Sequence, residues 1–258
     1  MLKLQEISSY FLYTKSSASA GLFVVLQGGS VCKNSAVLFT FHRFYGIIQL
    51  IDKLEFGEMK YMKILWIIIL VADNLLPLLL AHFYPNYKHK EMALSVLGSR
   101  QSPVKWIYNV WCILSGVVFC IAPYALYQEN IGGLAIAIWI LLAIYGIGCE
   151  IISGFCPLNE NRQDEDALTK IHGGASAIGF MTLIAVPLLL AIMQFQAGDI
   201  IMGAISLVSF IAPFLFFCFF IMGEKEKFAN TVLRYGGLWQ SLVLVSCYVP
   251  LAIWCVTK

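Results

Sequence analysis

The chain has 258 residues, of which 60% are hydrophobic and 12% are charged, and its net charge is +2. Soluble domains are about half apolar and about a quarter charged, so this composition favours a membrane protein over a large soluble domain. The net charge is too small, and the basic residues are too scattered, to indicate a nucleic-acid partner.

The segment 1–58 does not resemble the rest of the chain. Its apolar run, 36–51, is short and is interrupted by His42 and Arg43, which makes it a poor membrane span. It also lacks the ordered regions of a signal peptide. Because a strong apolar run follows Met59 at once, we interpret 1–58 as an N-terminal extension, either an over-long gene start or a poorly ordered or surface-lying arm.

Six apolar runs follow this segment. A membrane-spanning helix needs about 20 mostly apolar residues, and runs of roughly this length lie at about 64–83, 104–124, 131–154, 172–194, 199–222 and 238–256. None of them shows the alternation that is typical of a transmembrane barrel. Residues 59–258 are therefore predicted to form one all-α domain, a polytopic membrane protein with a bundle of six transmembrane helices.

The first apolar run carries two polar residues, Asp73 and Asn74, near its middle. A charged aspartate at the centre of a bilayer costs about 2.5–3.5 kcal/mol, so Asp73 is expected to face the interior of the bundle or to be protonated. The simpler alternative is a hydrogen bond between helices next to Pro77.

Polar residues in three later runs are expected at one membrane depth. With a rise of about 1.5 Å per residue, Asn109, Glu150 and Ser176 each lie about 6–8 Å from the ends of their runs, on the side of the loops 84–103 and 155–171. Helical spacing places Ser153 on the face of Glu150 and His172 on the face of Ser176. His82 and His172 are expected at the rim.

These positions predict a polar vestibule that is lined by Asn109, Glu150, Ser153, His172 and Ser176 and serves as a ligand or catalytic site. Glu150 and His172 are the candidates for acid/base catalysis, but no GxSxG context supports a serine nucleophile. The serines are also typical packing residues that bond back to their own helix. The acidic loop 159–166 is interpreted as solvated, with Asp166 capping the next helix.

The eight cysteines show no CxxC spacing, and most of them lie inside the predicted spans. They are interpreted as small buried apolar residues rather than as a disulfide frame or a zinc site. A zinc hydrolase needs three protein ligands, typically with a close pair such as HExxH, and none occurs here. A bis-histidine haem would have His82 and His172 at most. The sequence therefore predicts no metal and no cofactor.

Several short motifs occur in a fixed order: Leu-Ser-Val-Leu-Gly-Ser (94–99), Ser-Pro-x5-Asn (102–109), Ser-Gly-Phe-Cys-Pro-Leu (153–158), His172 and Gly-Leu-Trp-Gln (237–240). They resemble the prokaryotic six-helix membrane proteins of domain-of-unknown-function family 998. Members of that family typically read I-S-x-L-G after the first span and G-x-F-P before the third loop, with a histidine opening the fourth span. The resemblance covers about 60–256. It implies a six-span fold and a bacterial plasma membrane, and it supplies no activity. Cys156 stands between the usual Phe and Pro, so the loop geometry is expected to differ there.

Three hypotheses for the function remain open. The first is binding, sensing or transport of a lipid or small amphiphile whose polar end contacts Glu150 and His172. The second is an intramembrane enzyme that acts on lipid, with Glu150 or His172 as acid/base. The third is a structural or assembly partner without a ligand. In each case the protein is expected to be a multi-pass protein of the plasma membrane, and its protein partners are not indicated.

Overall fold

The computed structural model describes residues 59–159 and 166–257 of the chain. In these ranges six helices are long and apolar enough to cross a membrane: Lys60–Ala81, Lys105–Glu129, Gly133–Phe155, Ala167–Gln196, Ile200–Gly223 and Gly236–Thr257. The prediction of an all-α membrane protein with six transmembrane helices is therefore confirmed. The interpretation of 1–58 as an extension lies outside the described residues.

The helical elements in chain order are α3 (Met59–Ala81), η2 (Leu94–Gly98), α4 (Lys105–Ile121), α5 (Tyr124–Glu129), α6 (Gly133–Tyr145), η3 (Gly146–Ile152), α7 (Ser153–Phe155), α8 (Ala167–Gln196), α9 (Ile200–Gly223), η5 (Glu226–Phe228), η6 (Val232–Arg234) and α10 (Gly236–Thr257). Two spans are composite. The second joins α4 to α5 at Pro123, and the third runs from α6 through the π-helix η3 into α7. The sequence did not predict the π-helix.

Local chemistry explains where α8 begins and ends. Asp166 caps the N-terminus by accepting a hydrogen bond from the backbone N–H of Thr169, as the sequence predicts. Past the C-terminus, Gly198 has a φ of +79°, a left-handed conformation that glycine adopts without strain. The N–H groups of Gly198 and Asp199 donate to carbonyls of the last helical turn, so the chain reverses into α9 in a short turn.

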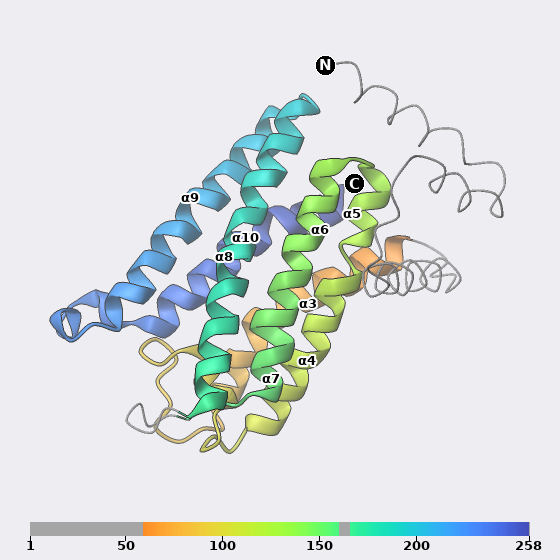
Figure 1. The fold of residues 1–258 in the computed structure, drawn as a ribbon. Helices are drawn as coiled ribbons and strands as arrows, with labels where there is room; N and C mark the ends of the chain where they lie inside the picture. The colour runs from red at the N-terminus through yellow and green to blue at the C-terminus, as the bar shows by residue number, and fades with distance from the viewer. Residues whose placement is uncertain (1–58, 160–165, 258) are drawn as a thin grey trace, which may run out of the picture. The chain divides into compact units, whose positions relative to one another are not determined.

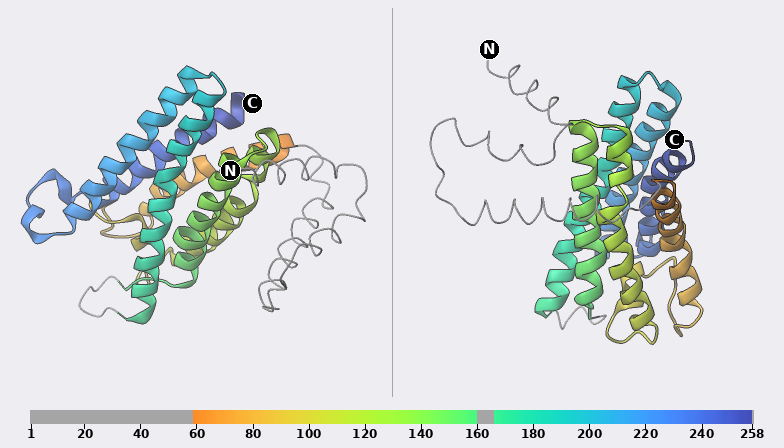
Figure 2. Two further views of the ribbon diagram at one scale, coloured as in Figure 1. Left: turned by 45° about the horizontal axis from the view of Figure 1, so that its top comes forward. Right: turned by 90° about the vertical axis from the view of Figure 1, so that its right-hand side faces the viewer.

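The spans lie side by side, with α8 against α6, η3 and α9, and α10 against α3 and α9 (Figure 1). The right-hand view of Figure 2 shows the segments 82–104 and 156–159 at one end of the helices and the α8–α9 turn at the other. We call the end with the segments 82–104 and 156–159 the loop end. The connection between α9 and α10 is fastened to it, because Arg234 pairs with Glu91.

Large apolar side chains fill the centre of the bundle, and the largest fully buried ones include Trp66, Phe119, Tyr145 and Trp254. Other large apolar side chains of the spans point outward, among them Ile68, Leu79, Ile140, Val208 and Phe214. In a bilayer these outward side chains contact lipid tails instead of water. The lipid bilayer is therefore the environment of the protein.

Glycines let the backbones of neighbouring spans approach closely around η3. A Cβ atom on Gly116 of α4 would lie 2.5 Å from the carbonyl oxygen of Gly146. On the other side of η3, a Cβ atom on Gly179 of α8 would lie 2.7 Å from Sγ of Cys149. Small residues at helix crossings allow this approach in membranes. The position of η3, which carries Glu150, is therefore set by glycine contacts on two sides.

Candidate functional site

A network of hydrogen bonds crosses the interior of the bundle and begins at Asp73 of α3, which is only 7% exposed. The indole N–H of Trp111 donates to Asp73 Oδ1 at 2.7 Å, and the hydroxyl of Ser115 lies 3.0 Å from both carboxylate oxygens. The hydroxyl of Tyr248 donates to Asp73 Oδ2 at 3.1 Å. Helices α3, α4 and α10 are therefore joined at this carboxylate.

The network continues from Tyr248 to a second carboxylate. The hydroxyls of Tyr248 and Tyr145 lie 2.6 Å apart, and the hydroxyl of Tyr145 lies 2.8 Å from Glu150 Oε1. The four groups thus form a line, Asp73–Tyr248–Tyr145–Glu150, which connects two acidic side chains inside the membrane-spanning region. We call this line the carboxylate–tyrosine chain.

The π-helix η3 explains how Glu150 enters this chain. A π-helix forms i→i+5 hydrogen bonds in place of i→i+4, and short π segments are frequent at functional sites. Tyr145 and Glu150 are five residues apart and are hydrogen-bonded to each other. The α-helical spacing that we used to place Glu150 and Ser153 on one face does not hold across this segment. Ser153 instead turns to α8.

Neither of the two carboxylates has a cationic partner in the part of the protein that the structure describes. Within the described residues, neither Asp73 nor Glu150 forms an ion pair with lysine, arginine or histidine. By contrast, Lys63 pairs with Glu129 at the end of the bundle opposite the loop end, and Lys63 Nζ lies 5.0 Å from the centre of the Trp254 ring. Among residues 59–159 and 166–257, the partners that hold these two carboxylates are hydroxyl and indole groups, which carry no positive charge.

The two ends of the carboxylate–tyrosine chain differ in solvent exposure. Asp73 is buried, whereas Glu150 is half-buried. Glu150 is therefore the more exposed end of the carboxylate–tyrosine chain.

The residues of the predicted vestibule have the following places. Ser153 and Ser176 lie together, with their hydroxyls 2.9 Å apart. His172 is buried, and its Nδ1 lies 2.9 Å from the carbonyl oxygen of Cys156. In the described part of the chain, Glu150 shares no hydrogen bond with His172 or with either serine.

The remaining polar residues named from the sequence bond to nearby carbonyls. Asn109 donates its amide to the carbonyl of Gly98 at 3.1 Å. His82 is exposed, and its Nδ1 lies 2.8 Å from the carbonyl oxygen of Leu78 in its own helix. Asn74 likewise donates to its own helix, at the carbonyl of Leu70. The structure thus gives Glu150 a place in the carboxylate–tyrosine chain and gives these three residues local roles.

Sequence reasoning missed four residues of the network, which are Trp111, Ser115, Tyr145 and Tyr248. One signal was available, because Trp111 and Ser115 are four residues apart and share a helix face. A tyrosine hydroxyl inside a span also needs a hydrogen-bond partner. Which carboxylate each group meets depends on which helices are neighbours, and the sequence alone does not show this.

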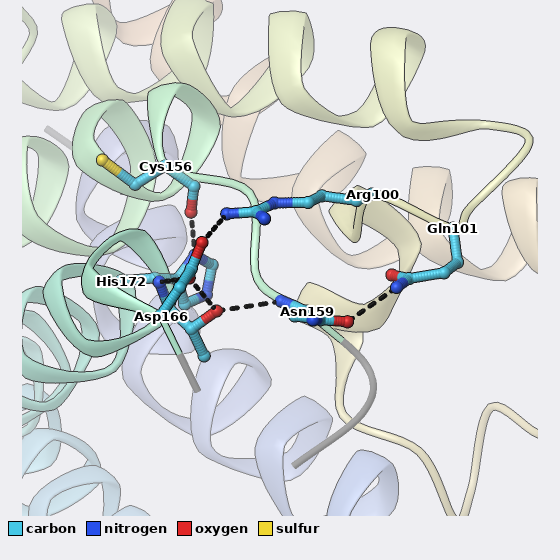
Figure 3. A network of polar contacts seen from close by, with 7 residues as sticks. Arg100, Gln101, Cys156, Asn159, Asp166 and His172 are labelled. Carbon is cyan, nitrogen blue, oxygen red and sulfur yellow. Dashed lines mark hydrogen bonds and ion pairs between the residues drawn. The ribbon is translucent and has the colours of Figure 1, made fainter. Parts of the chain in front are cut away.

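The loop end holds a separate set of polar contacts that ties the segment before α4 to the segment after α7 and the first turn of α8 (Figure 3). Arg100 pairs with Asp166. Gln101 donates its amide to Asn159 Oδ1 at 2.6 Å, and the N–H of Asn159 donates to Thr169 Oγ1 at 3.0 Å. These groups are occupied within the protein, which favours a structural role. The part of the chain that the structure describes also holds no cluster of three acidic, histidine or cysteine side chains suited to a metal.

The contacts of Asp166 make the loop end sensitive to acid. Hydrogen bonding from the Thr169 N–H, and then the pairing with Arg100, lower the pKa of this carboxyl from 3.8 to about 2. Because the pKa is lower in the folded state, the ionised form stabilises the loop end above pH 3.8, and this contribution is lost as the pH falls towards 2.

We therefore expect Asp166→Ala to raise the hydrogen-exchange rate of the Thr169 amide by about fivefold at neutral pH, through loss of the cap. Asp166→Asn keeps an oxygen acceptor but loses the ion pair, so its rate is expected to lie between those of Asp166→Ala and the wild type. Exchange measured by mass spectrometry, corrected for intrinsic rates, checks this. Equal rates in all three proteins would show that Asp166 does not hold the first turn of α8.

Comparison with known proteins agrees with the resemblance that the sequence motifs indicate. A family model described as "Protein of unknown function (DUF998)" matches residues 67–257. No curated protein and no solved structure matches the chain. The match covers all of the helical region except the beginning of α3 and includes every residue of the carboxylate–tyrosine chain. The chain therefore belongs to the DUF998 family of multi-pass membrane proteins.

Proposed function

We propose that the protein binds a lipid or small amphiphile in the plasma membrane, as part of transport or sensing, and that Glu150 contacts the polar end of this ligand. The observation that supports the proposal is that Glu150, a half-buried acidic residue within a span, lacks a cationic partner among the described residues. Intramembrane acidic residues of this kind mark ligand and ion pathways in many membrane proteins. The surrounding bilayer accommodates an apolar tail.

The chemistry around Glu150 favours a ligand with a cationic head group. A carboxylate accepts hydrogen bonds from an ammonium group, and such charge-assisted bonds are about twice as strong as neutral ones. An anionic head group would be repelled by the negative charge of this carboxylate pair.

The two alternatives have weaker support. An intramembrane enzyme needs a nucleophile or a water molecule held beside an acid/base, but Ser153 bonds to Ser176 and His172 to a backbone carbonyl. A purely structural role is consistent with the many hydrogen bonds of the carboxylate–tyrosine chain. It does not explain why Glu150 is left half-buried at one end of that chain.

Three amphiphiles with the same tail test this proposal: dodecylammonium, dodecanol and dodecanoate. We expect native mass spectrometry of the purified protein to show the tightest binding for dodecylammonium, and Glu150→Gln to weaken it by about tenfold, because the variant loses a charge-assisted hydrogen bond. His172→Ala tests whether the histidine contributes as well.

Glu226→Gln is the matched control, because Glu226 is exposed and lies in the connection between α9 and α10. It should bind dodecylammonium as the wild type does. Equal binding of the three amphiphiles, or equal binding by the wild type and Glu150→Gln, would contradict the proposal and favour a structural role. A co-purified lipid that is present in the wild type and missing from Glu150→Gln would identify the natural class of ligand directly.

A further inference from the structure

We infer that the carboxylate–tyrosine chain is a proton-binding site in which Asp73 and Glu150 share one proton through the hydroxyls of Tyr145 and Tyr248. The inference goes beyond the proposed amphiphile site, because it concerns the occupancy of the whole chain and requires no ligand at Glu150. It rests on the hydrogen-bond geometry of four side chains from four helical elements, α3, α6, η3 and α10.

The number of available hydrogens supports the inference. The carboxylate–tyrosine chain has three oxygen–oxygen contacts: 2.8 Å from Glu150 to Tyr145, 2.6 Å from Tyr145 to Tyr248, and 3.1 Å from Tyr248 to Asp73. Each of these hydrogen bonds needs one hydrogen. The two tyrosine hydroxyls supply one hydrogen each, and an ionised carboxylate supplies none. With both carboxylates ionised, one pair of oxygens would face each other without a hydrogen. The third hydrogen must therefore be carried by one of the carboxyl groups.

The partners outside the chain indicate where this proton resides. Asp73 accepts two further hydrogen bonds, from the indole N–H of Trp111 and the hydroxyl of Ser115, and these stabilise its ionised form. Glu150 has no comparable set of donors. The favoured arrangement therefore has Glu150 protonated and donating to Tyr145, Tyr145 donating to Tyr248, and Tyr248 donating to the Asp73 carboxylate.

The opposite arrangement is reached without adding or removing an atom. Glu150 gives its proton to the oxygen of Tyr145, Tyr145 passes its own hydrogen to Tyr248, and Tyr248 passes its hydrogen to Asp73. Each oxygen–oxygen contact keeps one hydrogen, and one negative charge moves from Asp73 to Glu150. The proton can thus be exchanged at Glu150 and stored at Asp73.

The surroundings of the carboxylate–tyrosine chain favour one negative charge on its two carboxyl groups over two negative charges. Among the described residues, the ionisable groups that interact electrostatically with Glu150 are, besides those of the carboxylate–tyrosine chain, the hydroxyl of Tyr108 and the thiols of Cys112 and Cys149. None of these carries a positive charge, and the described residues place no lysine, arginine or histidine in an ion pair with either carboxylate. Two uncompensated like charges in a low-dielectric interior are strongly unfavourable, and one retained proton removes half of this charge.

Amide substitutions give a sharp test, because a side-chain amide can donate the hydrogen that the proton otherwise supplies. In Glu150→Gln the amide donates to Tyr145 and Asp73 stays ionised. In Asp73→Asn the amide donates to Tyr248 and Glu150 becomes ionised. Each single variant should therefore abolish the same carboxylic-acid signal, although it removes a different carboxyl group.

The measurement is infrared spectroscopy of the full-length protein in lipid nanodiscs at neutral pH, with exchange into D2O to identify the C=O stretch of protonated carboxyl groups. The wild-type spectrum minus that of either variant should show one such band of equal intensity, and Glu226→Gln should show no difference. Two independent carboxyl groups would instead leave a band in one of the variants, and this would overturn the inference. A wild-type protein without a protonated carboxyl band would overturn it even if neither variant folds.

The spectra also separate this inference from the proposed function. Binding of dodecylammonium at Glu150 should draw the negative charge to Glu150 and move the shared proton to Asp73, so the band should shift in frequency and keep its intensity as this probe is added. A protein that shows the band but does not bind the probe would keep the proton site and reject the amphiphile site. A protein that binds the probe but lacks the band would keep the amphiphile site and reject the proton site.

Discussion

Replacing Gly116 by alanine should lower the free energy of unfolding by about 2–3 kcal/mol, because the new methyl group has no space. Its Cβ atom would lie 2.5 Å from the carbonyl oxygen of Gly146, 2.7 Å from a side-chain carbon of Ile151 and 2.8 Å from Cβ of Glu150. A backbone carbonyl cannot rotate away as a side chain can, so α4 and η3 must separate. This separation would also move Glu150 away from Tyr145.

The matched control is Gly174→Ala in α8. Apart from the adjoining backbone of α8, no atom of the described residues lies within 4 Å of the Cβ position at Gly174, so the methyl group has space. Alanine is a better helix former than glycine by about 1 kcal/mol, and the control should be as stable as the wild type or more so. Thermal and denaturant unfolding in one detergent compare the three proteins. Equal losses in Gly116→Ala and Gly174→Ala would show that α4 and η3 are not held at the spacing seen in the structure.

The sequence predicted the fold class well because each helix that crosses a bilayer must be apolar along its length, and this requirement is visible in the sequence. A span of about 20 apolar residues is visible without any knowledge of its neighbours. The cap at Asp166 was equally local, since it depends on a residue and the helix that follows it. These features are encoded within one segment of the chain.

The site could be predicted only in part, because it depends on which helices are neighbours. Asp73 stands out as a charge within a span, but nothing in the sequence pairs it with Tyr248, which is 175 residues away. The π-helix adds a second difficulty. It changes the helical spacing between Gly146 and Ile152, so depth and face arguments that use a period of 3.6 misplace Glu150 and Ser153 relative to each other.

Glu150 has hydrogen-bond partners in the structure that its depth in the membrane does not predict. The vestibule predicted from depth alone groups Glu150 with His172 and the serines, whereas the structure bonds Glu150 to Tyr145 and leads on to Asp73. For a carboxylate that is hydrogen-bonded to a line of hydroxyl groups, the simplest reaction is proton exchange. Ligand binding and proton exchange at Glu150 are then linked, since a cation and a proton compete for the same oxygen atoms.

Replacing Asp73 by leucine should lower the free energy of unfolding by about 3 kcal/mol, because it leaves buried donors without an acceptor. The indole N–H of Trp111 and the hydroxyls of Ser115 and Tyr248 all lose their shared partner. Ser115 can bond back to its own helix, and Tyr248 retains Tyr145, so the unpaired indole accounts for most of the loss. Unfolding in the same detergent as for the glycine variants measures this change.

The neighbouring residue provides the control that separates a lost network from a changed helix. Among the described residues, Asn74 bonds only to the carbonyl of Leu70 in its own helix, so Asn74→Leu leaves no other of these groups unpaired and should change stability by less than about 1 kcal/mol. Asp73→Asn, which keeps both an acceptor and a donor, should be close to the wild type. Removing a charge from the membrane interior is favourable in itself, so a leucine variant more stable than the wild type would mean that the carboxylate is retained for its chemistry and that the network contributes little to the fold.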